Sequence, residues 1–450
     1  MTAAPPKRRW LMRSLIFLGA SVALLGLGLV GWVAYASRDI PAPDVSDLML
    51  PRIKVPADKD AYTHFDAAAD ALVWPKDEKP MKDFLADKPA DEAALREWVA
   101  SNHEALAYIK MGLACEVCVG PQERRLDATC PIGQWGKLQK LLRVKEKLHQ
   151  RAGERAEALT VCMDILRFAD LALLNAESHT MWLFGVSALA DGLLQLEGLV
   201  MDAPATQAEL AKLLEAMNAI RPVMQDLARA TKGQYTMVEE FIGRLERAEM
   251  GRTEVIGWNV ESWARNALMK AYIFQPNRTR LAAASVYRAE LRNVGRCLAE
   301  MELERKNIGL TEEESKFELI RRPNMIGRVL LASLVGTGDR LQWHNCRQEC
   351  NIAGVRLMLA LRLFEMREGH LPADLEELVP VYLTEVPRDP YDGKRFGYLP
   401  EKRLVYAVGQ DLKDSGGSKV VAKKFEKMSE SAKRWQAEDV VFELGPRDGK

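Results

Sequence analysis

Acidic residues that could hold a metal ion lie near the C-terminus of the chain. Asp411, Asp414 and Asp439 offer carboxylate oxygens, and the glycine pair Gly416 and Gly417 offers carbonyl oxygens in a turn. Calcium prefers six to eight hard oxygen ligands, so these residues form a candidate calcium site. The alternative interpretation is that the three carboxylates are solvated turn residues.

The 7 cysteines include a Cys-x-x-Cys pair, Cys115 and Cys118, which is followed by Cys130. The pair resembles half of a zinc site, but zinc needs four ligands and no second pair has a suitable spacing. Outside the cytoplasm, the favoured use is a disulfide between Cys130 and either Cys115 or Cys118, with free buried thiols as the alternative. Cys346 and Cys350 are one helical turn apart, which favours packing thiols over a disulfide.

Signatures of catalysis are weak in this sequence. The 6 histidines occur singly, and the HExxH, GxSxG and Walker motifs are absent. A hydrolase acting on envelope polymers would have to use carboxylates as its acid and base, for which Glu239 and Glu240 are candidates. The sequence therefore leans against an enzyme and leaves the question open.

Composition favours a folded protein with no attraction for nucleic acid. The chain has 450 residues, of which 48% are hydrophobic, so it is long enough for two or more domains. Lys plus Arg and Asp plus Glu both total 63, so no net positive charge attracts nucleic acid. A Gly-x-Gly-x-x-Gly match at residues 26–31 lies inside an apolar segment with no preceding strand, which excludes it as a nucleotide-binding motif.

The N-terminal segment predicts a membrane anchor. No charged residue occurs between Arg13 and Arg38, and residues 14–36 are long and apolar enough to span a bilayer. The basic residues that precede the span place residues 1–13 in the cytoplasm and the rest of the chain outside, which for a bacterial inner membrane is the periplasm. The length of the span favours an anchor over a signal peptide, although the sequence before and including Ala36 also fits a cleavage site.

Beyond the span, proline and aspartate predict an extended tether over residues 37–59, followed by a helical domain over 60–340. Helical spacing predicts helices at about 91–113, 136–150, 154–176, 179–201, 206–220, 222–249, 257–272 and 277–306. The hairpin around Gly153 resembles a tetratricopeptide unit, so a peptide-binding helical repeat protein is one alternative function.

The last segment, residues 341–446, predicts a small α+β module. One more helix ends near Gly369, and strands follow at roughly 396–399, 404–408 and 440–444, the first two joined by a turn at 400–403. The predicted fold class is therefore mostly α: a transmembrane helix, a bundle or hairpin domain of helices, and a small α+β module.

Motifs in these last 100 or so residues resemble the globular part of the major pseudopilin of type II secretion. The matching segments are 368–372 (EGHLP), 386–393 (VPRDPYDG) and 406–411 (YAVGQD). The resemblance implies a helix leading into a short antiparallel sheet, and a calcium loop in which Asp411 and Asp439 match the family's acidic residues. The chain departs from the family at Leu412, where glycine is expected, in an insertion over 419–433, and in lacking a prepilin leader.

The whole arrangement resembles a family of uncharacterised bacterial membrane-anchored envelope proteins with a helical middle. That family lends no activity. The span, the charge bias and the C-terminal motifs favour a non-enzymatic envelope protein with a scaffolding or partner-binding role and with a candidate calcium site in its C-terminal module. The expected partners are the membrane and other envelope proteins. The envelope hydrolase and the peptide-binding repeat protein remain the alternatives.

Overall fold

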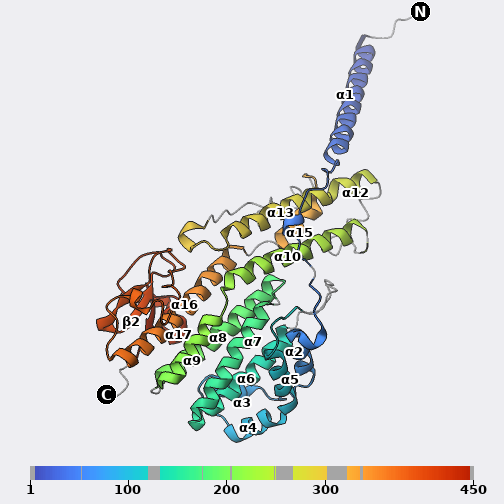
Figure 1. Cartoon of the computed structure of the whole chain (residues 1–450). Coiled ribbons are helices and arrows are strands. Elements are labelled where there is room, and N and C mark those ends of the chain that lie inside the picture. The colour runs from blue at the N-terminus through green and yellow to red at the C-terminus, as the bar shows by residue number, and fades with distance from the viewer. Residues whose placement is uncertain are drawn as a thin grey trace, which may run out of the picture. The chain divides into compact units, whose positions relative to one another are not determined.

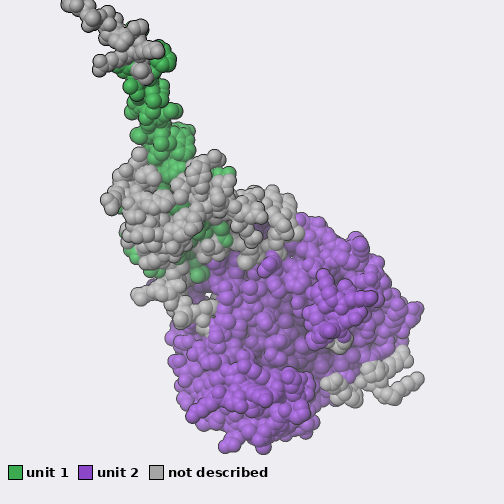
Figure 2. All heavy atoms as spheres, turned by 180° about the vertical axis from the view of Figure 1, so that it is seen from behind, with its two compact units in different colours: residues 1–49, 235–288, 304–336 green, residues 50–234, 289–303, 337–450 purple. Residues whose placement is uncertain are grey.

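The computed structural model describes residues 6–51, 53–119, 132–174, 176–202, 205–247, 249, 267–301, 322–334 and 338–445. Helices dominate these residues, and one small sheet lies near the C-terminus (Figure 1), as the sequence predicts. Contacts divide the chain into two compact units, coloured in Figure 2. Unit 1 comprises residues 1–49, 235–288 and 304–336, and unit 2 comprises 50–234, 289–303 and 337–450. This division differs from the predicted boundaries, because segments distant in sequence pack together.

Unit 1 contains the N-terminal helix, α1, which runs over Pro6–Ala36. Its stretch Met12–Ala36 is long and apolar enough to cross a membrane, and none of its most apolar window is buried. The other described helices of unit 1 are the last part of α10 (Val223–Glu246), α12 (Ala267–Ile273), most of α13 (Pro276–Asn293) and α15 (Met325–Leu334). Of the helix predicted over 257–272, residues 257–266 lie outside the described residues.

The segment after α1, predicted as a tether, is hydrogen-bonded to α13 within unit 1. The Asp39 carboxylate accepts bonds from the amides of Asn277 (2.8 Å) and Arg278 (3.1 Å), which are otherwise unsatisfied in the first turn of a helix. The guanidinium of Arg288 donates to both carboxylate oxygens of Asp47, at 2.9 and 2.6 Å. These hydrogen bonds therefore hold residues 39–47 against α13. A short 3-10 turn, Ser46–Leu48, lies in this segment.

Unit 2 begins with four short helices, which precede a layer of long ones. The short helices are α2 (Ala61–Asp70), α3 (Lys79–Leu85), α4 (Glu92–Ser101) and α5 (His103–Leu113). The single helix predicted over 91–113 is therefore wrong, because the chain breaks at Asn102. The Asn102 side chain accepts a bond from the Val73 amide at 2.8 Å and donates to the Val73 carbonyl at 3.1 Å, which fixes the break.

The long helices of unit 2 are α6 (Ile132–Ala152), α7 (Arg155–Leu174), α8 (His179–Asp202) and α9 (Gln207–Ala219). The hairpin predicted around Gly153 is present, with that glycine in the left-handed region at φ +74°. Helix α7 packs between α6 and α8 (Figure 1), which explains why nearly all of its apolar side chains are buried. Helix α8 is also apolar enough to pass as a membrane span, but 56% of its most apolar window is buried inside the fold.

The C-terminal part consists of α16 (Gly338–Glu368), a sheet and the short helix α17 (Glu430–Arg434). Strands β1 (Gly397–Leu399), β2 (Leu404–Ala407) and β3 (Val440–Glu443) form an antiparallel sheet in the order β1-β2-β3. In its register Tyr398 lies opposite Val405, and Val405 opposite Phe442. The three predicted strands are confirmed to within one residue at each end.

One face of the sheet packs into the core formed with α16, while Leu404, Tyr406 and Val441 form a small separate cluster. Gly354 of α16 allows close approach, since a Cβ at that position would lie 2.3 Å from the ring of Phe442 in β3. One cluster of buried side chains runs from α7, α8 and α9 through α16 to the sheet. Helix α16 begins at Gly338, close to the predicted boundary at 340/341, and its buried side chains belong to the same cluster as those of α7, α8 and α9.

The helix predicted over 277–306 ends earlier, at Asn293. Gly295 follows it in the left-handed region at φ +84°, which ends the helix. A short 3-10 turn at Leu298–Glu300 then runs beside the C-terminal part, where the amide of Leu298 donates to the Pro390 carbonyl at 2.9 Å.

Candidate functional site

The candidate calcium residues lie in one loop region around Asp439, just before β3. The Asp439 side chain is fully buried, and its carboxylate accepts bonds from the amides of Ser415 (3.2 Å), Gly417 (2.8 Å) and Ser418 (2.9 Å). Burial raises the pKa of Asp439, while the three amides act in the opposite direction. In this structure the carboxylate therefore organises the loop through the backbone.

The other two candidates are exposed and also bonded locally. Asp411 accepts from the Lys413 amide at 3.1 Å, and Asp414 accepts from the Gly416 amide at 2.9 Å and the Tyr406 hydroxyl at 3.0 Å. Among the described residues, no three acidic, histidine or cysteine side chains are arranged to hold a metal ion. Calcium binding at this loop stays a prediction.

Asp389 and Asp392 stabilise the turn between α16 and the sheet. Each accepts a bond from the amide two residues further on, Tyr391 at 2.8 Å and Lys394 at 2.9 Å. Burial raises the pKa of Asp389 to about 6. These two carboxylates stabilise the turn that leads into the sheet.

Two of the three cysteines predicted to form a disulfide are described, and both are buried free thiols. Cys115 and Cys118 lie in the loop after α5, where Arg167 donates to the Cys115 carbonyl at 2.7 Å and the Val119 amide donates to Asp60 at 2.9 Å. Burial raises the pKa of both thiols. Cys130 lies outside the described residues, so its pairing stays a prediction. Cys346 and Cys350 are buried in α16 as packing thiols.

The candidate acid and base, Glu239 and Glu240, are consecutive residues of α10. The Glu239 carboxylate accepts from the Arg280 guanidinium at 2.7 Å, and the same guanidinium pairs with Glu246 at 2.8 Å. Side chains of consecutive helical residues point about 100° apart, so the two carboxylates do not face one another. Glu239 is thus part of an ion-pair cluster, and the enzyme hypothesis gains no support here.

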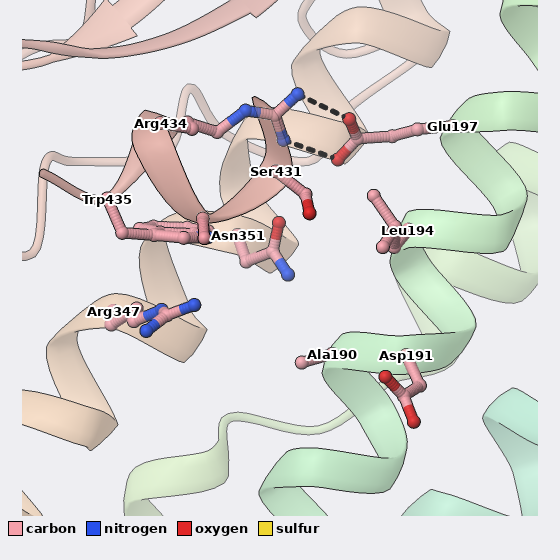
Figure 3. Close-up of a pocket in the computed structure, with 10 residues that line it drawn as sticks. Ala190, Asp191, Leu194, Glu197, Arg347, Asn351, Ser431, Arg434 and Trp435 are labelled. Carbon is pink, nitrogen blue, oxygen red and sulfur yellow. Dashed lines mark hydrogen bonds and ion pairs between the residues drawn. The ribbon is translucent and has the colours of Figure 1, made fainter. Parts of the chain in front are cut away.

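A cavity of about 190 Å³ lies within unit 2 between α8, α16 and α17 (Figure 3). It exceeds the volume of about 150 Å³ that accommodates a benzene-sized ligand in a protein core. Helix α17 forms one wall of this cavity. The cavity is lined by Ala190, Asp191, Leu194, Glu197, Arg347, Asn351, Ser431, Ala432, Arg434 and Trp435.

Arg347 supplies an uncompensated positive charge to this cavity. Its Cζ lies 4.6 Å from the centre of the Trp435 ring and 5.7 Å from that of Trp343, so two indoles flank it. Among the described residues, no carboxylate pairs with Arg347 and no acceptor hydrogen-bonds its guanidinium. Burial lowers the pKa of Arg347, which shows that its charge has lost part of its hydration.

Asn351 adds an unpartnered amide one helical turn further along α16. The residue is only 5% exposed, and its side chain has no hydrogen-bond partner in the described part of the chain. Figure 3 shows the amide between Arg347 and Leu194, inside the cavity. This amide and the neighbouring guanidinium both line the cavity, so together they offer hydrogen-bond donors to a ligand with acceptor atoms.

The two carboxylates that line the cavity are already paired. Glu197 forms two hydrogen bonds with Arg434, and Asp191 accepts from Arg143 and Gln139, each at 3.0 Å. Burial raises the pKa of Asp191. With both acids neutralised by partners, the cavity favours an anionic group beside Arg347.

None of these cavity residues was predicted as a site. Trp343, Arg347 and Asn351 recur at four-residue spacing, which places them on one helix face. This spacing is the one feature of the sequence that could have indicated the site. The spacing could not show that Trp435 would cover this face. No protein-family model matches the chain, and no curated protein or solved structure was found to be similar to it.

Proposed function

We propose that this chain is a non-enzymatic, membrane-anchored binding protein that holds a carboxylate of its partner in the cavity beneath α17. The observation that carries this proposal is the guanidinium of Arg347, half-buried between two indoles and without an anionic partner. A buried unpaired charge is costly, and a bound anion offsets that cost. Arginine suits the task, because its planar fork donates two parallel bonds to a carboxylate.

The rest of the cavity defines the group attached to this carboxylate. Asn351 donates or accepts one more hydrogen bond, and Leu194, Ala190, Ala432 and the Trp435 ring provide apolar walls. A single short aliphatic residue with a free carboxylate fits these walls and the volume. Two sources share this chemistry: the C-terminus of a partner polypeptide and a free small branched acid. The expected partner-binding role favours the C-terminus.

The proposal is tested by titrating ligands into the full-length chain in detergent. The probes are the acetylated tripeptide Ala-Ala-Leu with a free carboxylate, the same tripeptide with a C-terminal amide, and 4-methylpentanoate. We expect saturable heat with the free tripeptide and binding at least about tenfold weaker with its amide. Equal binding of acid and amide, or no binding of either acid, overturns the proposal. Binding of 4-methylpentanoate alone assigns the site to free small acids.

We also propose that the N-terminus lies in the cytoplasm and that both folded units lie outside it, in the bacterial periplasm. The apolar helix Met12–Ala36 and the basic residues before it support this orientation. Protease added to spheroplasts should degrade the folded units of the full-length chain and spare an N-terminal epitope. Protection of the whole chain from that protease contradicts this topology.

A further inference from the structure

Four exposed basic residues of unit 1 lie in segments that meet at the end of α1 remote from the N-terminus. They are Arg38, Lys270, Arg278 and Arg322, called here the cationic collar. Arg278 donates to the Arg38 carbonyl at 3.4 Å, which brings two members together directly. The other two lie two residues before Tyr272 and Asn324, and the Asn324 amide donates to the Tyr272 carbonyl at 2.8 Å.

Contacts with α1 fix the height of the collar along that helix. The rings of Trp32 and Tyr272 pack at 5.8 Å between centroids, and the Gln275 amide group donates to the Ala36 carbonyl at 2.6 Å. Trp32 precedes Ala36 by four residues, or about 6 Å along the axis. Residues 270–278 are therefore held beside the last turns of the apolar helix.

This height corresponds to the headgroup layer of a bilayer. The 25 residues of Met12–Ala36 form a helix of about 37 Å, which exceeds the hydrocarbon core of about 30 Å. The last turn of α1 then lies in the interface, where tryptophan and tyrosine are favoured. Groups fastened to that turn face lipid headgroups.

Among the described residues, positive charge exceeds negative charge around this position. The one carboxylate that the described contacts bring to the end of α1, that of Asp39, is occupied by the backbone amides of Ile40, Asn277 and Arg278. Arg38 and Lys270 have no carboxylate partner among the described residues. Cations at this depth interact favourably with anionic lipid phosphates.

We infer that the cationic collar binds the phosphate groups of anionic lipids, so that unit 1 rests on the membrane surface as well as being tethered to it. The inference depends on α1 spanning the membrane and is independent of the carboxylate site in unit 2. Its partner is a phospholipid headgroup with net negative charge, such as phosphatidylglycerol.

The test measures lipid selectivity around the full-length chain in phosphatidylcholine vesicles. Spin-labelled phosphatidylglycerol and spin-labelled phosphatidylcholine are compared by the motionally restricted fraction of their electron paramagnetic resonance spectra. We expect phosphatidylglycerol to be enriched about fivefold, and the enrichment to disappear in about 1 M salt. Extraction of the vesicles at alkaline pH first confirms that the chain is membrane-integral.

Variants locate the binding. The triple variant Arg38→Gln, Lys270→Gln, Arg278→Gln should lose most of the enrichment, whereas Arg395→Gln with Lys402→Gln, exposed in unit 2, should retain it. A separate Lys7→Gln, Arg8→Gln, Arg9→Gln variant measures the contribution of the other leaflet.

Equal restriction of both lipids by the parent chain, or an unchanged preference in the collar variant, overturns the inference. Circular dichroism checks the fold, and the single variant Lys270→Gln should show a partial loss. Competition by inorganic phosphate at millimolar concentration would assign the site to free phosphate and would also overturn it.

Discussion

The guanidinium of Arg434 and the carboxylate of Glu197 form two parallel hydrogen bonds of 2.9 and 2.7 Å. Because 237 residues separate them, this pair joins α17, near the end of the chain, to α8 in its middle. Arg434 also lies 4.8 Å above the Phe442 ring of β3. The pair thus positions α17 over the cavity, and Trp435, the residue after Arg434, covers Arg347.

Replacing either partner of this pair should destabilise unit 2. Both side chains are largely buried, so Glu197→Gln or Arg434→Gln should each cost about 1.5–3 kcal/mol of unfolding free energy. The double variant should cost less than the sum, since the second change removes a charge already without a partner. Denaturant unfolding measures all three. The exposed pair of Lys419 and Glu443 is the control, and replacing either of its residues should lower the unfolding free energy by less than about 1 kcal/mol. If the effects of Glu197→Gln and Arg434→Gln are strictly additive, the two side chains do not interact.

Glu146 should make stability depend on pH. It is 2% exposed in α6, one of its oxygens has no hydrogen-bond partner, and burial raises its pKa from 4.5 to about 7. The folded state therefore binds more protons than the unfolded state between these values, and its stability falls as pH rises through this window. The shift corresponds to about 3 kcal/mol.

The variant Glu146→Gln should remove this part of the pH dependence and raise stability at pH 8 relative to the parent. Urea unfolding at pH 5 and pH 8 measures it, and Glu157→Gln, exposed on α7, is the control. If the unfolding free energy changes between pH 5 and pH 8 by the same amount in the parent and in Glu146→Gln, the Glu146 carboxylate does not cause the pH dependence.

Asp39 should hold the segment after α1 against α13. Its carboxylate caps the first turn of α13, so Asp39→Ala should destabilise unit 1 by about 0.5–2 kcal/mol, and Asp39→Asn, which also caps helices, by less. Limited proteolysis should cleave Asp39→Ala faster within residues 39–49. The control is Asp58→Ala, an exposed carboxylate of a 3-10 turn. Equal cleavage rates in the parent and both Asp39 variants contradict the capping role.

Calcium binding near Asp439 has a specific structural consequence. An ion on this carboxylate would compete with the amides of Ser415, Gly417 and Ser418 for its lone pairs. In the parent chain we therefore expect saturable calcium binding by calorimetry and a shift of the three amide resonances. The binding should be lost in Asp414→Ala and in Asp439→Ala. Absence of heat in the parent would contradict calcium binding and leave Asp439 with its structural role in the loop.

Local signals in the sequence were sufficient for the sheet but not for the cavity. The strands are bounded by turns within a few residues, and the left-handed Arg403 closes the turn before β2, so the predicted ends are accurate. The break at Asn102 was missed because its bonding partner, Val73, lies 29 residues away. The site was missed for the same reason: Arg347 and Trp435 meet only when α17 folds over α16.

The most direct test of the account compares Arg347→Ala and Arg347→Lys with the parent chain by calorimetric titration of 4-methylpentanoate and the free tripeptide. We expect binding to weaken at least about tenfold in the alanine variant and less in the lysine variant, which keeps the charge but not the fork. Arg367→Ala, at the exposed end of α16, should bind like the parent. Undiminished binding in Arg347→Ala would contradict the proposed carboxylate site.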